Sequence, residues 1–182
     1  VKEEHPLTSC RFDREGFGAE VGNAVLQPGA LTGSCTSRSQ TVSWDLRYTG
    51  GQPPIHFLPP SLYEGSFPKA KSFVGVPLAI FSGSVTVDGR ALDVENWTGS
   101  QNHNWGRQHT DYYAFGQVAG FDNAPDSFLE IVSAQLKFGP VWTPTLTPIV
   151  LRRQGKDHSF VKLMDAARTT PVPAPPAPAL GR

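Results

Sequence analysis

The sequence predicts an all-β protein whose antiparallel strands form a barrel or a sandwich. Apolar and polar residues alternate along several segments, and turn residues separate those segments at intervals of about 8 to 15 residues. The 3.6-residue period of amphipathic helices is almost absent. Because strands do not alternate with helical segments, a parallel sheet built from βαβ units is not expected.

The first expected strand covers residues 41–49. Every second position in it is apolar or aromatic, namely Val42, Trp44, Leu46 and Tyr48. The intervening positions are polar, which is typical of an antiparallel strand that is buried on one face. The Asp88-Gly89 dipeptide lies between two further alternating runs. It predicts a hairpin over residues 85–94, because this dipeptide fits a tight two-residue turn.

Three later segments continue the pattern. In residues 110–122, one face carries the aromatic side chains Tyr113, Phe115 and Phe121. In residues 128–138, one face carries Phe128, Val132, Ala134, Leu136 and Phe138. A last hairpin is expected over residues 148–161, with its turn at Gln154-Gly155-Lys156.

Two proline-rich stretches frame the domain organisation. Residues 53–68 contain five prolines and indicate a long connection, because proline cannot donate a hydrogen bond to a β-ladder. Residues 171–179 have the composition of a polyproline-like spacer. We expect one β domain over residues 1–165, with an N-terminus that is not complete, and a Pro/Ala-rich tail or linker over residues 166–182.

The start of the chain favours a fragment, or one domain of a longer two-domain protein. Residue 1 is valine, and the only methionine is Met164. Residues 1–13 contain no apolar stretch of the kind found in an intact signal peptide. The length of 182 residues fits one domain of about 150 residues with a tail.

Charge and composition argue against a nucleic-acid-binding protein and against a transmembrane helix. The 16 basic residues are balanced by 16 acidic ones, so the basic excess of a nucleic-acid-binding protein is missing. No run of about 18 apolar residues exists, so no transmembrane helix is expected.

Cys10 and Cys35 allow one disulfide, but two reduced thiols in a reducing compartment such as the cytoplasm are the favoured interpretation.

Residues 97–113 are the densest cluster of functional side chains. His103 is suited to general acid or base chemistry, because its ordinary pKa lies near working pH. Arg107 has the geometry to pair with a carboxylate, and Trp97 and Trp105 are suited to line an apolar cavity. The alternative is a tight corner in which His and Asn side chains satisfy backbone groups.

No known catalytic or metal signature is present. His103, His109 and Asp111 are a conceivable metal-ligand set, but their spacing matches no familiar zinc motif. The chain also lacks a nucleophile elbow, a phosphate-binding loop and a dinucleotide fingerprint. We therefore expect neither a metal nor a cofactor.

Glu130 is a candidate acid because it falls on the apolar face of the 128–138 strand. A carboxyl group that faces a core is either paired or carries a raised pKa. A protonated carboxylic acid in an apolar cavity is what acid catalysis on a hydrocarbon requires. The alternatives are an ion pair with Arg107 or another neighbour, or a strand end that reaches water. Asp111 is a weaker candidate for the same role.

The segment from Ser100 through His103-Asn104-Trp105-Gly106 resembles a motif of the lipocalin-like superfamily that contains carotenoid 1,2-hydratases, AttH-type proteins and tocopherol cyclases. The second half of the motif matches, whereas Asn102 stands where the family has an aspartate. The resemblance covers roughly residues 40–140. It implies lipocalin-like β domains with an apolar site for isoprenoid-type molecules. It also puts the family's acid chemistry in doubt, because an amide cannot supply the proton.

Three hypotheses follow. The first is a lipocalin-like protein that binds an apolar, isoprenoid-like small molecule. The second is a cofactor-independent isoprenoid hydratase or cyclase that uses acid catalysis, with Glu130, Asp111 and His103 as its catalytic residues. The third is a non-catalytic structural or interaction domain. The expected ligand-binding residues are Trp97, Asn102, Asn104, Trp105, Arg107, Tyr113 and Phe115.

Overall fold

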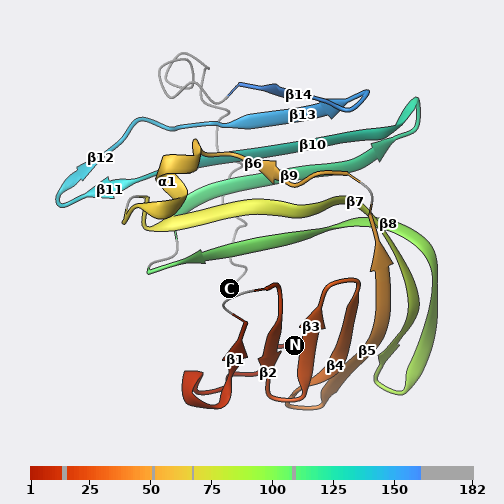
Figure 1. Ribbon diagram of the computed structural model, residues 1–182. Coiled ribbons are helices and arrows are strands. Elements are labelled where there is room, and N and C mark those ends of the chain that lie inside the picture. The colour runs from red at the N-terminus through yellow and green to blue at the C-terminus, as the bar shows by residue number, and fades with distance from the viewer. Residues whose placement is uncertain (14–15, 51, 67, 108–109, 161–182) are drawn as a thin grey trace, which may run out of the picture. The chain divides into compact units, whose positions relative to one another are not determined.

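The computed structural model describes residues 1–13, 16–50, 52–66, 68–107 and 110–160. The predicted all-β class with antiparallel pairing is confirmed (Figure 1). The described strands form sheets of eight, four and two strands. The strand order of each is open, so the described residues do not form the closed barrel that was one of the two expected arrangements. The predicted tail over residues 166–182 lies outside the described residues.

The chain divides into two compact units whose segments interleave in sequence. The first unit comprises Val1–Pro54 and Val74–Asn102, and the second comprises Ile55–Phe73 and the chain from His103 onward. Two long strands contribute residues to both units, β7 (Ala70–Val87) and β8 (Arg90–Gly106). Each unit is described separately below.

The first unit begins with a 3₁₀ turn at Leu7–Ser9 and continues as an antiparallel meander. Its strands are β1 (Arg11–Phe12), β2 (Ala19–Val21), β3 (Ala24–Gln27), β4 (Ala30–Ser37) and β5 (Gln40–Thr49). Each pairs with the next, and β5 pairs with β7. Both cysteines lie in this unit as half-buried free thiols.

β5 confirms the first predicted strand and its facing. Tyr48 is buried, and its hydroxyl donates a hydrogen bond to the Gln27 carbonyl over 3.3 Å. Its ring lies 5.4 Å from that of Phe81 on β7. Asp45 and Arg47 are exposed on the opposite face. The alternation in sequence therefore gave the correct inner face of this strand.

The β7–β8 hairpin confirms the predicted Asp88-Gly89 turn. Both turn residues have positive φ angles, 49° and 80°, as a type I′ turn requires. The turn is also tied to β5, because the Thr41 amide donates to the Asp88 carboxylate over 2.7 Å. In return, the Asp88 amide donates to the Thr41 carbonyl over 2.9 Å.

The second unit contains a four-stranded antiparallel sheet in the order β14-β13-β10-β9. Its strands are β9 (Tyr112–Phe121), β10 (Ala124–Gln135), β13 (Ile149–Arg153) and β14 (Lys156–Ser159). A small hairpin follows β10 and consists of β11 (Lys137–Phe138) and β12 (Val141–Trp142). The predicted strand over residues 128–138 thus ends at Gln135, and the predicted final hairpin is confirmed.

The proline-rich connection contains two elements that the sequence did not indicate. These are β6 (Ile55–His56) and a short helix, α1 (Pro60–Glu64). Proline at the first helical position is compatible with a helix, because the amide there needs no intrahelical partner. Among the described residues, no helix is long and apolar enough to cross a membrane.

Candidate functional site

The candidate site is one face of the β9–β10 pair in the second unit. The two strands are in continuous register from Phe128 opposite Ala119 to Gln135 opposite Tyr112. Gln117 lies directly opposite Glu130, and its side-chain amide donates to the Glu130 carboxylate over 2.6 Å. Because side chains alternate between faces, every second residue from this pair lies on the same face. We call this surface the Glu130 face.

Burial on the Glu130 face decreases from row to row. Phe128 and Glu130 are completely buried. The next row pairs Val132, which is half-buried, with Phe115, which is 54% exposed. The last row pairs Ala134 with Tyr113, which is 56% exposed. The face therefore has a closed end at Glu130 and an open end with two exposed aromatic rings.

Glu130 faces the core, as the alternation predicts. It is 0% exposed, and its cross-strand neighbour on β13 is Val150, which is also buried. Phe128 precedes it on the same face. A carboxyl group in these apolar surroundings is costly to bury, and the bond from Gln117 offsets part of that cost. A polar pair is thus fixed beneath the open aromatic end.

A second polar pair lies farther along the same face. Arg152 on β13 stands opposite Phe128, so it shares the Glu130 face. Only 4% of this residue is exposed, and its guanidinium binds the Asp157 carboxylate with two bonds of 2.5 and 2.7 Å. Such bidentate pairing is what makes a buried arginine tolerable. The pair ties β14 to β13 at the closed end.

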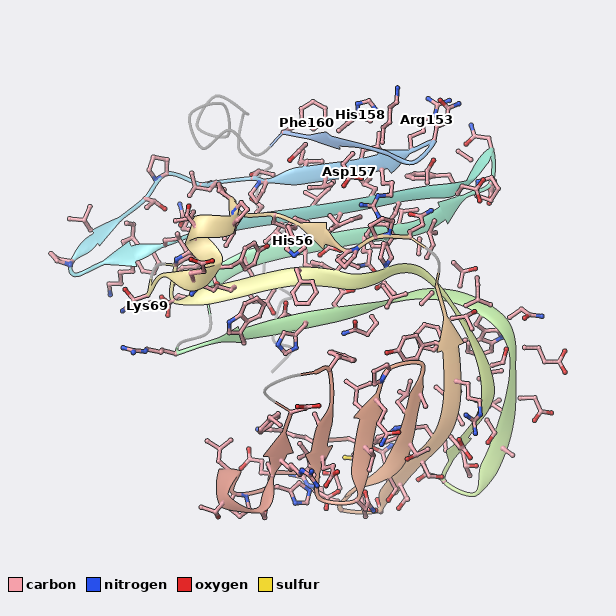
Figure 2. The ribbon with its side chains drawn as sticks, viewed as in Figure 1. His56, Lys69, Arg153, Asp157, His158 and Phe160 are labelled. Carbon is pink, nitrogen blue, oxygen red and sulfur yellow. The ribbon has the colours of Figure 1, made fainter. Side chains whose placement is uncertain are left out.

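A cluster of five rings surrounds the matched half of the sequence motif. Its members, which come from β6, α1, β7 and β8, are His56, Tyr63, Phe73, His103 and Trp105. Trp105 stacks on His103, with ring centroids 5.0 Å apart, and also on Tyr63 at 5.8 Å. His56 stacks on Phe73 at 5.5 Å. Figure 2 shows His56, which is exposed, as are His103 and Trp105.

Tyr63 anchors this cluster to the backbone. Its hydroxyl accepts bonds from the amides of Phe57 and Leu58 and donates to the Ser72 carbonyl over 2.9 Å. Burial raises the pKa of the Tyr63 phenol, although the two amide bonds act in the opposite direction. The neutral phenol therefore joins the loop before α1 to the start of β7.

The position after Trp105 requires a glycine, which is Gly106. Its φ angle is +152°, and a β-carbon there would overlap the carbonyl oxygen of Lys69. The close approach of the two chains also lets the Arg107 amide donate to that oxygen over 3.0 Å. The end of β8 is thereby fixed beside the start of β7, and Trp105 is held in the ring cluster.

The structure distributes the predicted site residues unevenly. Glu130, Tyr113 and Phe115 share one face, and His103 and Trp105 share the ring cluster. Asn104, Arg107 and Asp111 belong to the second unit and are exposed. Trp97 and Asn102 belong to the first unit, and Trp97 is 56% exposed.

His109 lies outside the described residues, so the conceivable ligand set of His103, His109 and Asp111 is only partly visible. Among the residues that the structure does describe, no three His, Cys, Asp or Glu side chains form a group suited to a metal ion.

Several residues of the site had no clear signal in the sequence. His56 and Tyr63 lie in the proline-rich connection, and Gln117, Arg152 and Asp157 lie on strands whose pairing is nonlocal. One signal was available: Arg152 and Asp157 stand opposite each other in the predicted final hairpin, which suggests an ion pair.

Comparisons with known proteins give a distant relationship. No family model matches the chain, and no solved structure matches it. Two uncharacterized proteins of Mycobacterium tuberculosis, from strains CDC 1551 / Oshkosh and H37Rv, are each 26% identical to it over 115 residues. The matched region covers 63% of this chain and 33% of each relative. The chain therefore spans about a third of the length of these relatives.

Proposed function

We propose that the second unit binds an apolar, isoprenoid-like small molecule on the Glu130 face. One observation carries the proposal: Tyr113 and Phe115 are more than half exposed on the same face on which the half-buried Gln117 is bonded to the completely buried Glu130. Small-molecule sites combine aromatic and apolar side chains with a few fixed polar groups, and this face supplies both. The isoprenoid class is what the resemblance of the motif implies.

Simple energetics support a ligand with both an apolar body and a polar end. The exposed parts of the two rings amount to roughly 100 Å² each, so covering both contributes about 5 kcal/mol. Association costs at least about 4 kcal/mol in lost translational and rotational freedom. The rings alone therefore give weak binding. A hydroxyl group that reaches the half-buried Gln117, which is held in place by Glu130, adds the hydrogen bond that raises the affinity.

The test is a titration of the full chain with all-trans-retinol, an isoprenoid alcohol whose fluorescence reports binding. Phe115→Ala removes one exposed ring at little cost to the core, and we expect its dissociation constant to rise at least tenfold. Trp97→Ala removes an equally exposed ring from the first unit and is the matched control. Equal affinity in the wild type and Phe115→Ala would refute the proposed site.

A second candidate function, acid-catalysed hydration of an isoprenoid alkene, is favoured by the complete burial of Glu130. In this reaction the carboxylic acid gives its proton to one alkene carbon. A water oxygen then bonds to the cationic carbon, and a proton of that water returns to the carboxylate. Incubation with an isoprenoid alkene in ¹⁸O-labelled water should give labelled alcohol. Glu130→Gln, which has no acidic proton, should abolish the product while retinol binding persists.

If neither retinol nor other isoprenoid alcohols bind the wild type, both functions lose their support. The third hypothesis, a structural or interaction domain, would then be preferred.

A further inference from the structure

An exposed aromatic group lies at the end of the second unit where β9 begins. Tyr112 is 63% exposed and packs against Trp142, with ring centroids 5.2 Å apart. Val141, beside Trp142 on β12, is 63% exposed. The ammonium group of Lys137 lies 5.2 Å from the centre of the Trp142 ring. We call these four residues the aromatic tip.

The aromatic tip is held by ordered backbone pairing. Lys137 stands opposite Trp142 in the β11–β12 register. At the base of the hairpin, the Thr143 amide donates to the Leu136 carbonyl, and the Leu136 amide donates to the Thr143 hydroxyl, both over 2.9 Å. The hairpin extends past the ends of β9 and β10 in Figure 1. Trp142 on this hairpin therefore packs beside Tyr112 at the first residue of β9.

Basic residues accompany the aromatic tip. The end of β8 and the start of β7 supply Arg107, Lys69 and Lys71, and the Arg107 amide binds the Lys69 carbonyl. Lys69 lies at the same end of the unit as the hairpin (Figure 2). Among the described residues of this end, Lys137 brings the number of cations to four, against two carboxylates in the neighbouring segments, Glu64 and Asp111. The full chain has no net charge, so this positive charge is local.

We propose that this end of the second unit docks on an anionic lipid bilayer. Tryptophan and tyrosine have an apolar body with a polar group, and they favour the boundary between lipid and water. Lysine and arginine complement anionic headgroups at that boundary. A protein partner of acidic surface would satisfy the cations, but the valine and the two large rings exposed beside them fit a lipid boundary better.

The inference rests on the proposed function, because the aromatic tip adjoins the open end of the Glu130 face. Tyr112 and Tyr113 are consecutive on β9 and therefore point to opposite faces. Tyr112 belongs to the aromatic tip, and Tyr113 to the open end of the Glu130 face. An apolar ligand dissolves in a bilayer far better than in water. Docking at this end brings the ligand face next to that reservoir.

The experiment is cosedimentation of the full chain with vesicles of phosphatidylcholine alone or with 30% phosphatidylglycerol. At about 0.1 M salt we expect at least tenfold stronger partitioning onto the anionic vesicles. We expect most of that difference to disappear at about 0.5 M salt, because salt screens the attraction. Equal partitioning onto both vesicle types, or none onto either, would overturn the proposal.

Two variants test the surface itself. Val141→Ser combined with Trp142→Ala removes apolar side chains of the tip, and Lys137→Glu reverses its charge without removing a ring. We expect each to reduce partitioning onto anionic vesicles at least fivefold, whereas Trp97→Ala leaves it unchanged. Unchanged partitioning of Lys137→Glu overturns the proposal even if the double variant fails to fold. A wild-type dimer that the double variant dissociates would assign the surface to a second copy instead.

Retinol binding in vesicle-free solution separates this inference from the proposed function. The tip variants should bind retinol as the wild type does, because Tyr113 and Phe115 remain. Loss of vesicle binding with retained retinol binding supports both proposals. If the wild type binds retinol but not anionic vesicles, only the docking proposal is refuted. If it binds anionic vesicles but not retinol, only the ligand-site proposal is refuted.

Discussion

The two units bury their side chains very differently. Within the described part of the chain, β1, β2, β3 and β4 of the first unit contain no buried residue. The largest completely buried side chains are Phe128, Ile55, Glu130, Val74, Val150 and Pro77. Four of these six belong to the second unit, including the only charged one of the set. The candidate site is therefore in the unit that holds most of the largest completely buried side chains among the described residues.

The difference shows what a buried polar group needs. β10 has a neighbour on each side, β9 and β13, so a side chain at its centre is covered from both directions. Glu130 then finds a partner in Gln117 on one neighbouring strand. β2, β3 and β4 of the first unit also have a neighbour on each side, yet they contain no buried residue. Strand pairing alone therefore does not bury a polar group, and the apolar residues that pack on the Glu130 face, such as Phe128 and Val150, are needed as well.

The largest expected effect is that of Phe128→Ala in the second unit. Removal of a completely buried phenylalanine costs about 3–5 kcal/mol of the free energy of unfolding, through lost burial and the cavity left behind. Val25→Ala in β3, where the side chain is half-buried, should cost about 1 kcal/mol or less. Urea unfolding of both variants measures the difference. Equal losses would contradict the contrast between the two cores.

A smaller effect is expected when the first unit is disrupted instead. Gly83 on β7 has a φ angle of +137°, and a β-carbon there would overlap the Asp45 carbonyl of β5. Gly83→Ala should therefore cost more than about 1 kcal/mol. Hydrogen exchange should become faster in β4 and β5 and stay unchanged in β10. Faster exchange in β10 alone would show that the substitution destabilises the second unit, which would contradict the prediction.

The smallest effect concerns pH and Tyr63. Burial raises the pKa of this phenol above its ordinary value of 10.0, so the folded state holds the proton more tightly than the unfolded state. The contribution of the protonated Tyr63 phenol to the free energy of unfolding is complete below pH 10.0 and is lost as pH rises through the pKa of the folded state. Tyr63→Phe should unfold more easily at neutral pH, because it lacks three hydrogen bonds, and should show a weaker decline of stability above pH 10.0. An unchanged alkaline decline in the variant would contradict this role of Tyr63.

The sequence predicted the strands with strong local signals. Alternation predicted β5 and the facing of Glu130, and turn residues predicted the hairpins at Asp88-Gly89 and Gln154-Gly155. Alternation predicts which face of a strand a side chain lies on, however, and not how deeply that side chain is buried. Tyr113 and Phe115 were expected on one face of a strand, and they share a face, but they lie at its open end.

The ring cluster shows why part of the site could not be predicted. His56 and Tyr63 lie in a proline-rich connection, far in sequence from His103 and Trp105. Their contacts depend on the pairing of β6 with β7 and of β7 with β8, and no local pattern encodes that pairing. The sequence made His103 and Trp105 candidate site residues, but it did not predict which rings they contact.

The most direct test of the central claim is to map the ligand on the protein by NMR. Retinol is titrated into ¹⁵N-labelled full chain, and the changes in amide chemical shift are compared between the two units. If the Glu130 face is the binding site, the largest changes occur in residues 113–117 and 130–134, and those of β2, β3 and β4 remain small. Largest changes in residues 19–37, or none on β9 and β10 at saturating retinol, would contradict the claim.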